Sequence, residues 1–103
     1  MSLPVVFRPQ ATRELVAAQN WYDDRQAGLG DAFRSALAQV VDHVSSQPQL
    51  YPRVRGEMRR ALVDRFPYGL YFEIVENRVV VLGIVHGHRD PQVWKSLRWV
   101  RSE

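Results

Sequence analysis

The sequence contains no cysteine. This absence excludes disulfide bonds, thiolate metal sites and cysteine nucleophiles, and a chain without thiols suits a reducing compartment. Long hydrophobic runs are also missing. No apolar stretch approaches membrane-spanning length, and Met1–Pro4 lacks the basic and then apolar segments of a signal peptide. We therefore expect a cytoplasmic protein that makes no contact with a membrane.

Lysine is almost absent, because arginine supplies all of the 14 basic residues except Lys95. The charge is unevenly placed: residues 1–50 carry four arginines and five acids, whereas residues 51–103 carry nine arginines, Lys95 and six acids, a net charge of +4. Guanidinium groups suit bidentate contacts with phosphate or carboxylate. Arginine-rich composition can equally reflect codon usage, so an anionic partner and a compositional bias both remain open.

The 103 residues allow one domain with a single core. In the first half, residues 5–8 are short and β-branched, which predicts a strand, and Pro9 can begin a helix. Apolar residues then recur at helical spacing over two segments, separated by Gly28 and by Asp31, a candidate N-cap. The first segment carries Ala11, Leu15, Ala18 and Tyr22, and the second carries Phe33, Leu37, Val40 and Val44. We predict two antiparallel helices over about 9–26 and 32–44.

The second half changes to the period of a strand. Residues 57–63, 68–76 and 78–86 are predicted strands, joined by a bend at 64–67 and by a tight turn at Glu76-Asn77. The run 45–56 is expected to be a long loop, and Asp90-Pro91 opens a short predicted helix. The order indicates an α+β fold of two layers: a strand, a helix hairpin, and an antiparallel meander of three or more strands ending in a short helix.

The turn at Glu76-Asn77 sets the register of the last two strands. It places Phe72 opposite Val81 and Tyr71 opposite Leu82, and opposed residues share a face. One face is then apolar and suits the helices: Leu70, Phe72, Ile74, Val79 and Val81. The other face carries Tyr71, Glu73, Val80, Leu82, His86 and His88, with Arg60 opposite Tyr71 across the bend. A slip of one residue would reverse this assignment.

His86 and His88 invite a metal interpretation, because residues two apart on a strand share a face and imidazole binds zinc. A third ligand would have to come from Asp90 or from His43 on the second helix. We favour structural or substrate-binding roles for the pair and predict no metal and no cofactor. His43 is expected to face solvent.

Aromatic residues can serve as stacking platforms, as core, or as anchors of an interface. We assign Trp21 and Tyr22 to the core. Trp94 and Trp99 lie in the terminal segment, where their apolar surface either covers the sheet or meets a partner.

The element order resembles the RelE/ParE superfamily of bacterial toxins, and three segments carry the resemblance. The first is the N-terminal strand with the helix pattern that includes Trp21-Tyr22. The second, residues 59–72, reads RRALVDRFPYGLYF and is similar to the family's second and third strands. The third, residues 81–91, reads VLGIVHGHRDP and is similar to the family's last strand. Together they span nearly the whole chain.

The resemblance implies the toxin component of a type II toxin-antitoxin system, neutralised by a cognate antitoxin and touching operator DNA only through it. RelE-like members cleave mRNA on the ribosome without a metal. ParE-like members inhibit DNA gyrase and have no known catalytic residues. The resemblance therefore leaves two targets.

A metal-free RNA endonuclease needs a base, an acid and a cation, and His88, His86, Tyr71 and Arg60 could supply them. Gly69, however, stands where RelE-like nucleases place an arginine. Those nucleases also tend to be rich in lysine on this sheet, whereas the only lysine here is Lys95. Both departures favour the ParE-like branch.

The residues expected to meet the target or the antitoxin are Arg59, Arg60, Arg65, Arg89 and Trp94. Three hypotheses follow, in order of preference. The chain is a gyrase-directed toxin, a ribosome-dependent mRNA endonuclease, or a non-toxic domain that binds nucleic acid or protein on the same fold.

Overall fold

The computed structural model describes residues 2–86. Strand β1 (Val5–Phe7) runs directly into helix α1 (Pro9–Arg25), which turns back into helix α2 (Leu29–Ser46). Pro9 occupies the first turn of α1, where its missing N–H costs no hydrogen bond. The helix predicted after Asp90-Pro91 lies outside the described residues.

Two glycines make the sharp connection between α1 and α2. Gly28 precedes α2 with φ at 88°, in the left-handed region that favours glycine. At Gly30 a Cβ atom would lie 2.6 Å from the backbone oxygen of Gln19, so only glycine permits this helix contact. The Gly30 N–H donates to Asp23 Oδ1 at 2.8 Å. The predicted N-cap, Asp31, is wrong: it lies in the first turn, and the acceptor comes from α1 instead.

The remaining strands complete a five-stranded sheet in the order β1-β5-β4-β3-β2. These strands are β2 (Arg53–Arg55), β3 (Met58–Leu62), β4 (Tyr68–Val75) and β5 (Arg78–His86). β1 is parallel to β5, and all other neighbours are antiparallel. The prediction of a long loop over 45–56 was wrong in part, because this run holds a single 3-10 turn (Pro48–Leu50) and β2.

The hairpin between β4 and β5 confirms the predicted turn. Glu76 and Asn77 have φ angles of 50° and 63°, and Val75 pairs with Arg78 across them. Positive φ at both central residues defines the mirror-image turn whose twist matches that of the flanking strands. Register is therefore fixed at this end of the hairpin.

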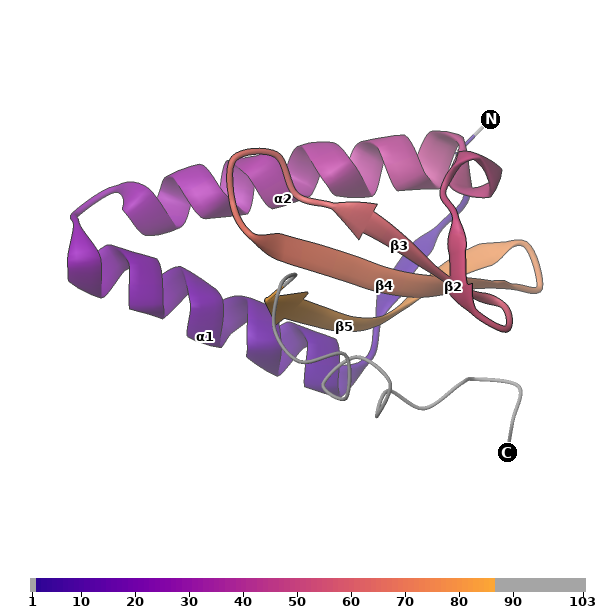
Figure 1. The fold of residues 1–103 in the computed structure, drawn as a ribbon, viewed down its shortest axis with the longest axis horizontal. Helices are drawn as coiled ribbons and strands as arrows, with labels where there is room; N and C mark the ends of the chain where they lie inside the picture. The colour runs from indigo at the N-terminus through magenta and orange to yellow at the C-terminus, as the bar shows by residue number, and fades with distance from the viewer. Residues whose placement is uncertain (1, 87–103) are drawn as a thin grey trace.

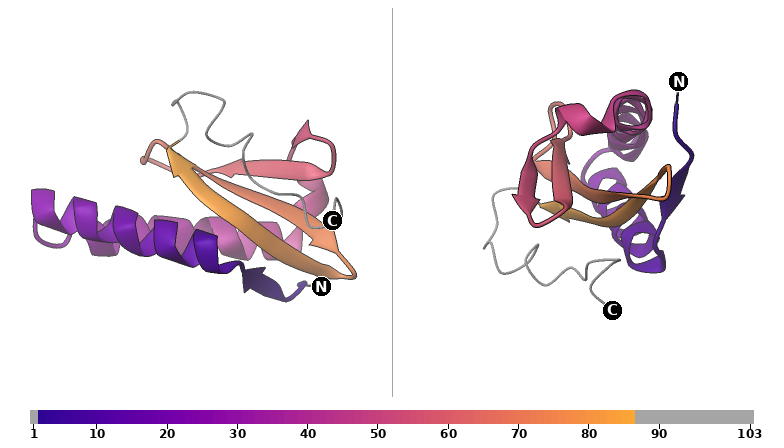
Figure 2. Two further views of the ribbon diagram at one scale, coloured as in Figure 1. Left: turned by 90° about the horizontal axis from the view of Figure 1, so that it is seen from below. Right: turned by 90° about the vertical axis from the view of Figure 1, so that its right-hand side faces the viewer.

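Both helices pack on one face of the sheet, which we call the helix-side face (Figures 1 and 2). Their apolar stripes meet the sheet residues predicted for this role: Leu70, Phe72, Val79 and Val81 are fully buried there. Phe33 of α2 is the centre of an aromatic group, with its ring centroid 5.2 to 5.4 Å from those of Tyr22, Phe66 and Tyr68. The predicted α+β two-layer fold is confirmed.

Helices of the described chain are too short or too polar to cross a bilayer.

Candidate functional site

A β-bulge interrupts the register of β4 and β5. Phe72 pairs with Val81 as predicted, but Tyr71 pairs with Gly83, so Leu82 is an extra residue on β5. Because side chains alternate, the extra residue sends every later side chain of β5 to the face opposite the predicted one. Ile84 accordingly packs in the helix-side core.

The bulge makes the prediction for His86 wrong. His86 pairs with Tyr68 at the end of the sheet, and its ring packs edge-on against the Tyr68 ring with a centroid distance of 5.3 Å. Both rings line a pocket with α1 on the helix side. Among residues 2–86, His86 Nδ1 is buried and has no hydrogen-bond partner. His86 is thus separated by the sheet from Tyr71, with which it was expected to form a site.

The other face of the sheet, here called the second face, holds its own buried cluster. Its members are Met58, Tyr71, Glu73, Val75, Val80, Leu82 and Val85. Tyr71 and Glu73 were expected on an open surface, yet both are 0% exposed. The structure therefore places these two polar side chains inside the protein rather than on a solvent-facing site.

Arg60 lies on the second face at the predicted position. It pairs with Tyr71 across β3 and β4, and its side chain is half-buried. Gly69 is next to both: a Cβ atom there would lie 3.2 Å from Tyr71 Cε1 and 3.4 Å from Arg60 Cγ and Cδ. The Arg60 stem and the Tyr71 ring thus crowd the space that a larger residue at 69 would need.

Arg59, the neighbour of Arg60, points to the helix side and has structural contacts. Its Nη1 donates to the carbonyl oxygens of Tyr51 at 2.6 Å and of Gln49 at 3.2 Å. These bonds tie the segment before β2 to β3. The two adjacent arginines, which the sequence grouped as one basic patch, therefore lie on opposite faces.

The other predicted contact residues are spread over the chain. Arg65 is exposed in the bend between β3 and β4, where its φ is 68°. His88, Arg89 and Trp94 lie outside the described residues. Strand β2 adds two exposed arginines that the sequence analysis missed, Arg53 and Arg55. The alternation Arg-Val-Arg was the signal for them, since it is the period of a strand.

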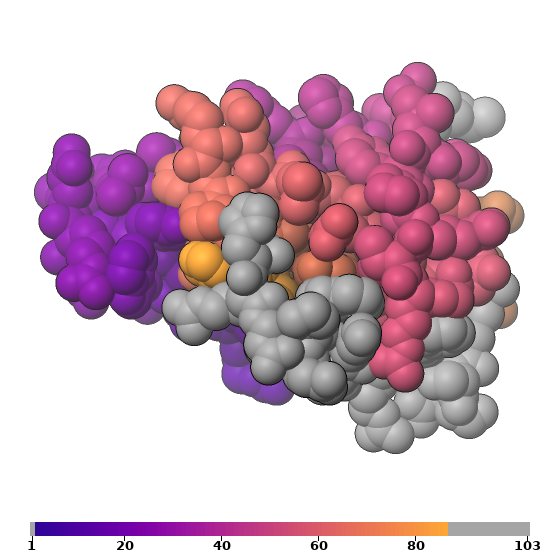
Figure 3. Space-filling view, in the orientation of Figure 1, coloured from indigo at the N-terminus to yellow at the C-terminus, as the bar shows by residue number. Residues whose placement is uncertain are grey.

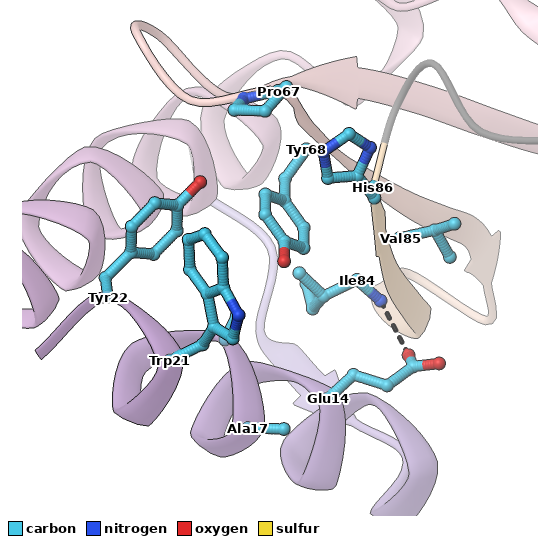
Figure 4. A pocket seen from close by; sticks show the side chains of 10 residues that line it. Glu14, Ala17, Trp21, Tyr22, Pro67, Tyr68, Ile84, Val85 and His86 are labelled. Atoms are coloured by element: carbon cyan, nitrogen blue, oxygen red, sulfur yellow. Dashed lines mark hydrogen bonds between the residues drawn. The ribbon is translucent and has the colours of Figure 1, made fainter. Parts of the chain in front are cut away.

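One opening between the helices and the sheet is the α1–β5 pocket, a cavity of about 580 Å³ (Figure 4). Five side chains give it its chemistry: Glu14, Trp21, Tyr22, Tyr68 and His86. Figure 4 shows Glu14 and Trp21 of α1 on one side of the opening and Tyr68 and His86 of the strands on the other. Glu14 Oε1 accepts a hydrogen bond from the Ile84 N–H at 2.8 Å, just after the bulge.

Trp21 does not belong to the core, so that prediction was wrong. Its side chain is 51% exposed, and the Arg25 guanidinium carbon lies 4.2 Å from the centroid of its ring. Tyr22 packs against the core as predicted. Burial raises the pKa of the Tyr22 phenol above its ordinary value of 10.0, and the neighbouring Tyr68 adds to the rise. The helical stripe explains the difference, because Tyr22 continues the spacing of Leu15 and Ala18 and Trp21 does not.

Within residues 2–86, no three His, Asp or Glu side chains gather closely enough to hold a metal ion. His43, weighed as a distant ligand, is exposed as predicted.

The comparisons with known proteins agree with this fold. A family described as "ParE toxin of type II toxin-antitoxin system, parDE" matches residues 5–91, which is most of the chain. The chain belongs to the ParE toxin family. The resemblance to the RelE/ParE superfamily is thereby confirmed. A search of curated protein sequences finds no match.

Solved structures of both branches resemble this ParE-family chain. A structure titled as the chromosomal ParDE toxin-antitoxin system from P. aeruginosa is 16% identical with a TM-score of 0.62, over 82% of this chain and 96% of that one. A mutant of E. coli toxin RelE in the free state is 16% identical with a TM-score of 0.69, over 94% of this chain and 95% of that one. A chain of the toxin-antitoxin complex RelBE2 from Mycobacterium tuberculosis is 19% identical with a TM-score of 0.61, over 84% of this chain and 99% of that one. At these identities the likeness concerns the fold alone.

Proposed function

We propose that this member of the ParE toxin family acts by binding a protein target, DNA gyrase, and that a cognate antitoxin neutralises it. The β-bulge at Leu82 is the observation that carries the proposal. It turns His86 toward α1, while Arg60 and Tyr71 lie on the second face. General acid-base catalysis requires groups within hydrogen-bond reach of one reacting centre. Here the sheet separates His86 from Arg60 and Tyr71, so the three cannot act on one such centre.

The surroundings of Gly69 support the same conclusion. A RelE-like nuclease is expected to hold a catalytic arginine there, and the Arg60 stem and the Tyr71 ring crowd that space in this chain. Tyr71 is also fully buried. A buried phenol cannot reach an RNA phosphate without a rearrangement of the sheet.

We assign the contact with protein partners to arginines at the β2–β4 side of the sheet. Arg53, Arg55 and Arg65 are exposed there and Arg60 is half-buried. Exposed guanidiniums in this arrangement fit acidic side chains of a target or antitoxin. Arg89 and Trp94 remain proposed members of the interface, whereas Arg59 is engaged by backbone carbonyls.

The target is tested by expressing the full chain and following DNA breaks, SOS induction and mRNA levels in parallel. We expect DNA breaks and SOS induction, and inhibition of purified gyrase in a supercoiling assay. The variants His86→Ala and His88→Ala should stay toxic. Rapid mRNA loss that disappears with His88→Ala would instead establish the endonuclease alternative. Harmless expression would overturn both toxic functions and leave a binding domain on the same fold.

The partner surface is tested by reversing one charge. Arg60→Glu should weaken neutralisation by the antitoxin encoded beside this chain, or weaken toxicity, by about tenfold or more. Arg13→Glu, which changes the same charge at an exposed position of α1, is the matched control and should change neither. If both variants behave like the parent chain, the β2–β4 arginines are not the interface.

A further inference from the structure

We propose that the α1–β5 pocket binds an arginine side chain of a partner protein. The pocket is distinct from the β2–β4 arginines, and the proposal does not depend on which target the toxin has. Three properties of the pocket carry it: aromatic walls, a carboxylate at the rim, and an opening large enough for a side chain with its flanking backbone.

The aromatic walls form a connected series of rings. Trp21 and Tyr22 meet edge to face with centroids 5.1 Å apart, Tyr22 and Tyr68 lie 6.2 Å apart, and Tyr68 and His86 lie 5.3 Å apart. Edge-to-face packing holds successive rings at steep angles to one another, so they wall a pocket instead of forming one flat stack. Ring faces carry negative potential and attract cations.

The same fold already contains one contact of this kind. The Arg25 guanidinium lies over the Trp21 ring, with its carbon 4.2 Å from the ring centroid. Trp21 is half exposed, so an incoming group can also reach it from outside.

Glu14 gives the pocket a negative charge. Its Oε1 is held by the Ile84 N–H at 2.8 Å, and its Oε2 accepts from the exposed amide of Gln10 at 3.2 Å. A fixed carboxylate beside ring faces suits a guanidinium, which is planar, stacks on rings and donates in a fork. The carboxylate disfavours a phosphate group, so nucleic acid is the weaker fit.

The cavity volume of about 580 Å³ falls within the range of ordinary ligand pockets and exceeds what one side chain fills. A short peptide with arginine at its centre therefore matches the opening better than a free guanidinium ion. Trp21 and Glu14 would contact the side chain, and Pro67 lies at the lining of the opening where a flanking residue would pack (Figure 4).

The experiment follows the indole N–H signal of Trp21 by NMR in the purified full chain. The signal is assigned with Trp21→Phe, and the probe is acetyl-Gly-Arg-Gly-amide. The matched probe carries citrulline, which has nearly the same shape and no charge. We expect saturable shifts with the arginine peptide and at least about tenfold weaker binding of the citrulline peptide, because a charge-assisted hydrogen bond is lost.

Two variants locate the charge. Glu14→Gln keeps an oxygen for the Ile84 N–H and should weaken the arginine peptide about tenfold. Asp24→Asn removes the same charge from an exposed position of α1 outside the pocket and should change nothing.

Four results would overturn the proposal. They are equal responses to arginine and citrulline peptides, no response to either, tighter binding of adenosine monophosphate than of the arginine peptide, and an unchanged affinity in Glu14→Gln. A shift of the Trp21 signal in Arg98→Gln or Arg101→Gln without any peptide would assign the pocket to the chain's own C-terminal segment, which also overturns it.

Discussion

The two faces of the sheet differ in chemistry although the same alternating strands build both. The second face buries Tyr71 and Glu73 beside aliphatic side chains and keeps Arg60 at its margin. The helix-side face ends in a pocket of rings around Glu14. A single extra residue at Leu82 places His86 on the helix-side face, in this pocket, and not on the second face. The comparison teaches that small irregularities of a sheet, more than its composition, distribute polar groups between faces.

The largest loss of stability is expected when a large side chain is removed from the buried cluster on either face of the sheet. Phe33→Ala, which empties the centre of the helix-side aromatic group, should lower the free energy of unfolding by about 4 kcal/mol. Met58→Ala on the second face should cost about 3 kcal/mol if that face is packed equally well. Urea unfolding measures both, with exposed Leu50→Ala as the control. A cost below about 1 kcal/mol for Met58→Ala would break the comparison.

Gly69→Arg tests the crowding on the second face. The new side chain would displace the Arg60 stem and the Tyr71 ring, so the free energy of unfolding should fall by about 3 kcal/mol. Leu62→Arg introduces the same side chain at the exposed partner of Gly69 and should change stability by less than about 0.5 kcal/mol. Equal costs in the two variants, measured by urea unfolding, would contradict the packing argument.

Arg59→Gln tests whether Arg59, unlike its neighbour Arg60, has a structural role. It removes charged donors from two backbone carbonyls and should lower the free energy of unfolding by about 2 kcal/mol. Arg53→Gln is the control, because the Arg53–Glu57 ion pair spans 3.8 Å between exposed groups and should contribute less than about 0.5 kcal/mol. A negligible effect of Arg59→Gln would return this residue to the candidate interface.

Glu14→Ala tests what holds the end of β5 after the bulge. Losing the acceptor of the Ile84 N–H should cost about 1 kcal/mol and speed hydrogen exchange at that amide. Glu14→Gln, which retains an acceptor, should exchange like the parent chain. Unchanged exchange in the alanine variant would show that strand pairing alone fixes this end of β5.

The smallest effect concerns Tyr22, whose phenol has a raised pKa through burial and the neighbouring Tyr68. Above the unfolded-state value of 10.0 the unfolded chain loses this proton first, so the phenol's contribution to stability falls as pH rises toward the folded pKa. Tyr22→Phe should therefore lessen the loss of thermal stability between neutral and alkaline pH. If the two pH profiles run parallel, burial of this phenol has no energetic consequence.

The sequence predicted most of the fold and only part of the site. The structure confirms the local patterns. These are the apolar stripes of the two helices, which end in Tyr22 and Val44, and the turn at Glu76-Asn77. Arg60 was placed correctly opposite Tyr71 because the bend fixes that register. His86 was misplaced because the pattern near the bulge is apolar on both faces, so alternation gives no sign of an inserted residue. The α1–β5 pocket joins residues 14 and 86, which no local pattern connects.

The sequence by itself determined the order of elements, the apolar face that the helices cover, and the family resemblance that the comparison over residues 5–91 confirms. These follow from periodicity and turn chemistry, which act between near neighbours. Only the tertiary structure decided that Arg59 is bound by carbonyls, that Tyr71 is buried, and that His86 lines the same pocket as Glu14 and Trp21. Those outcomes depend on one extra residue in a strand and on contacts between distant segments, which packing selects.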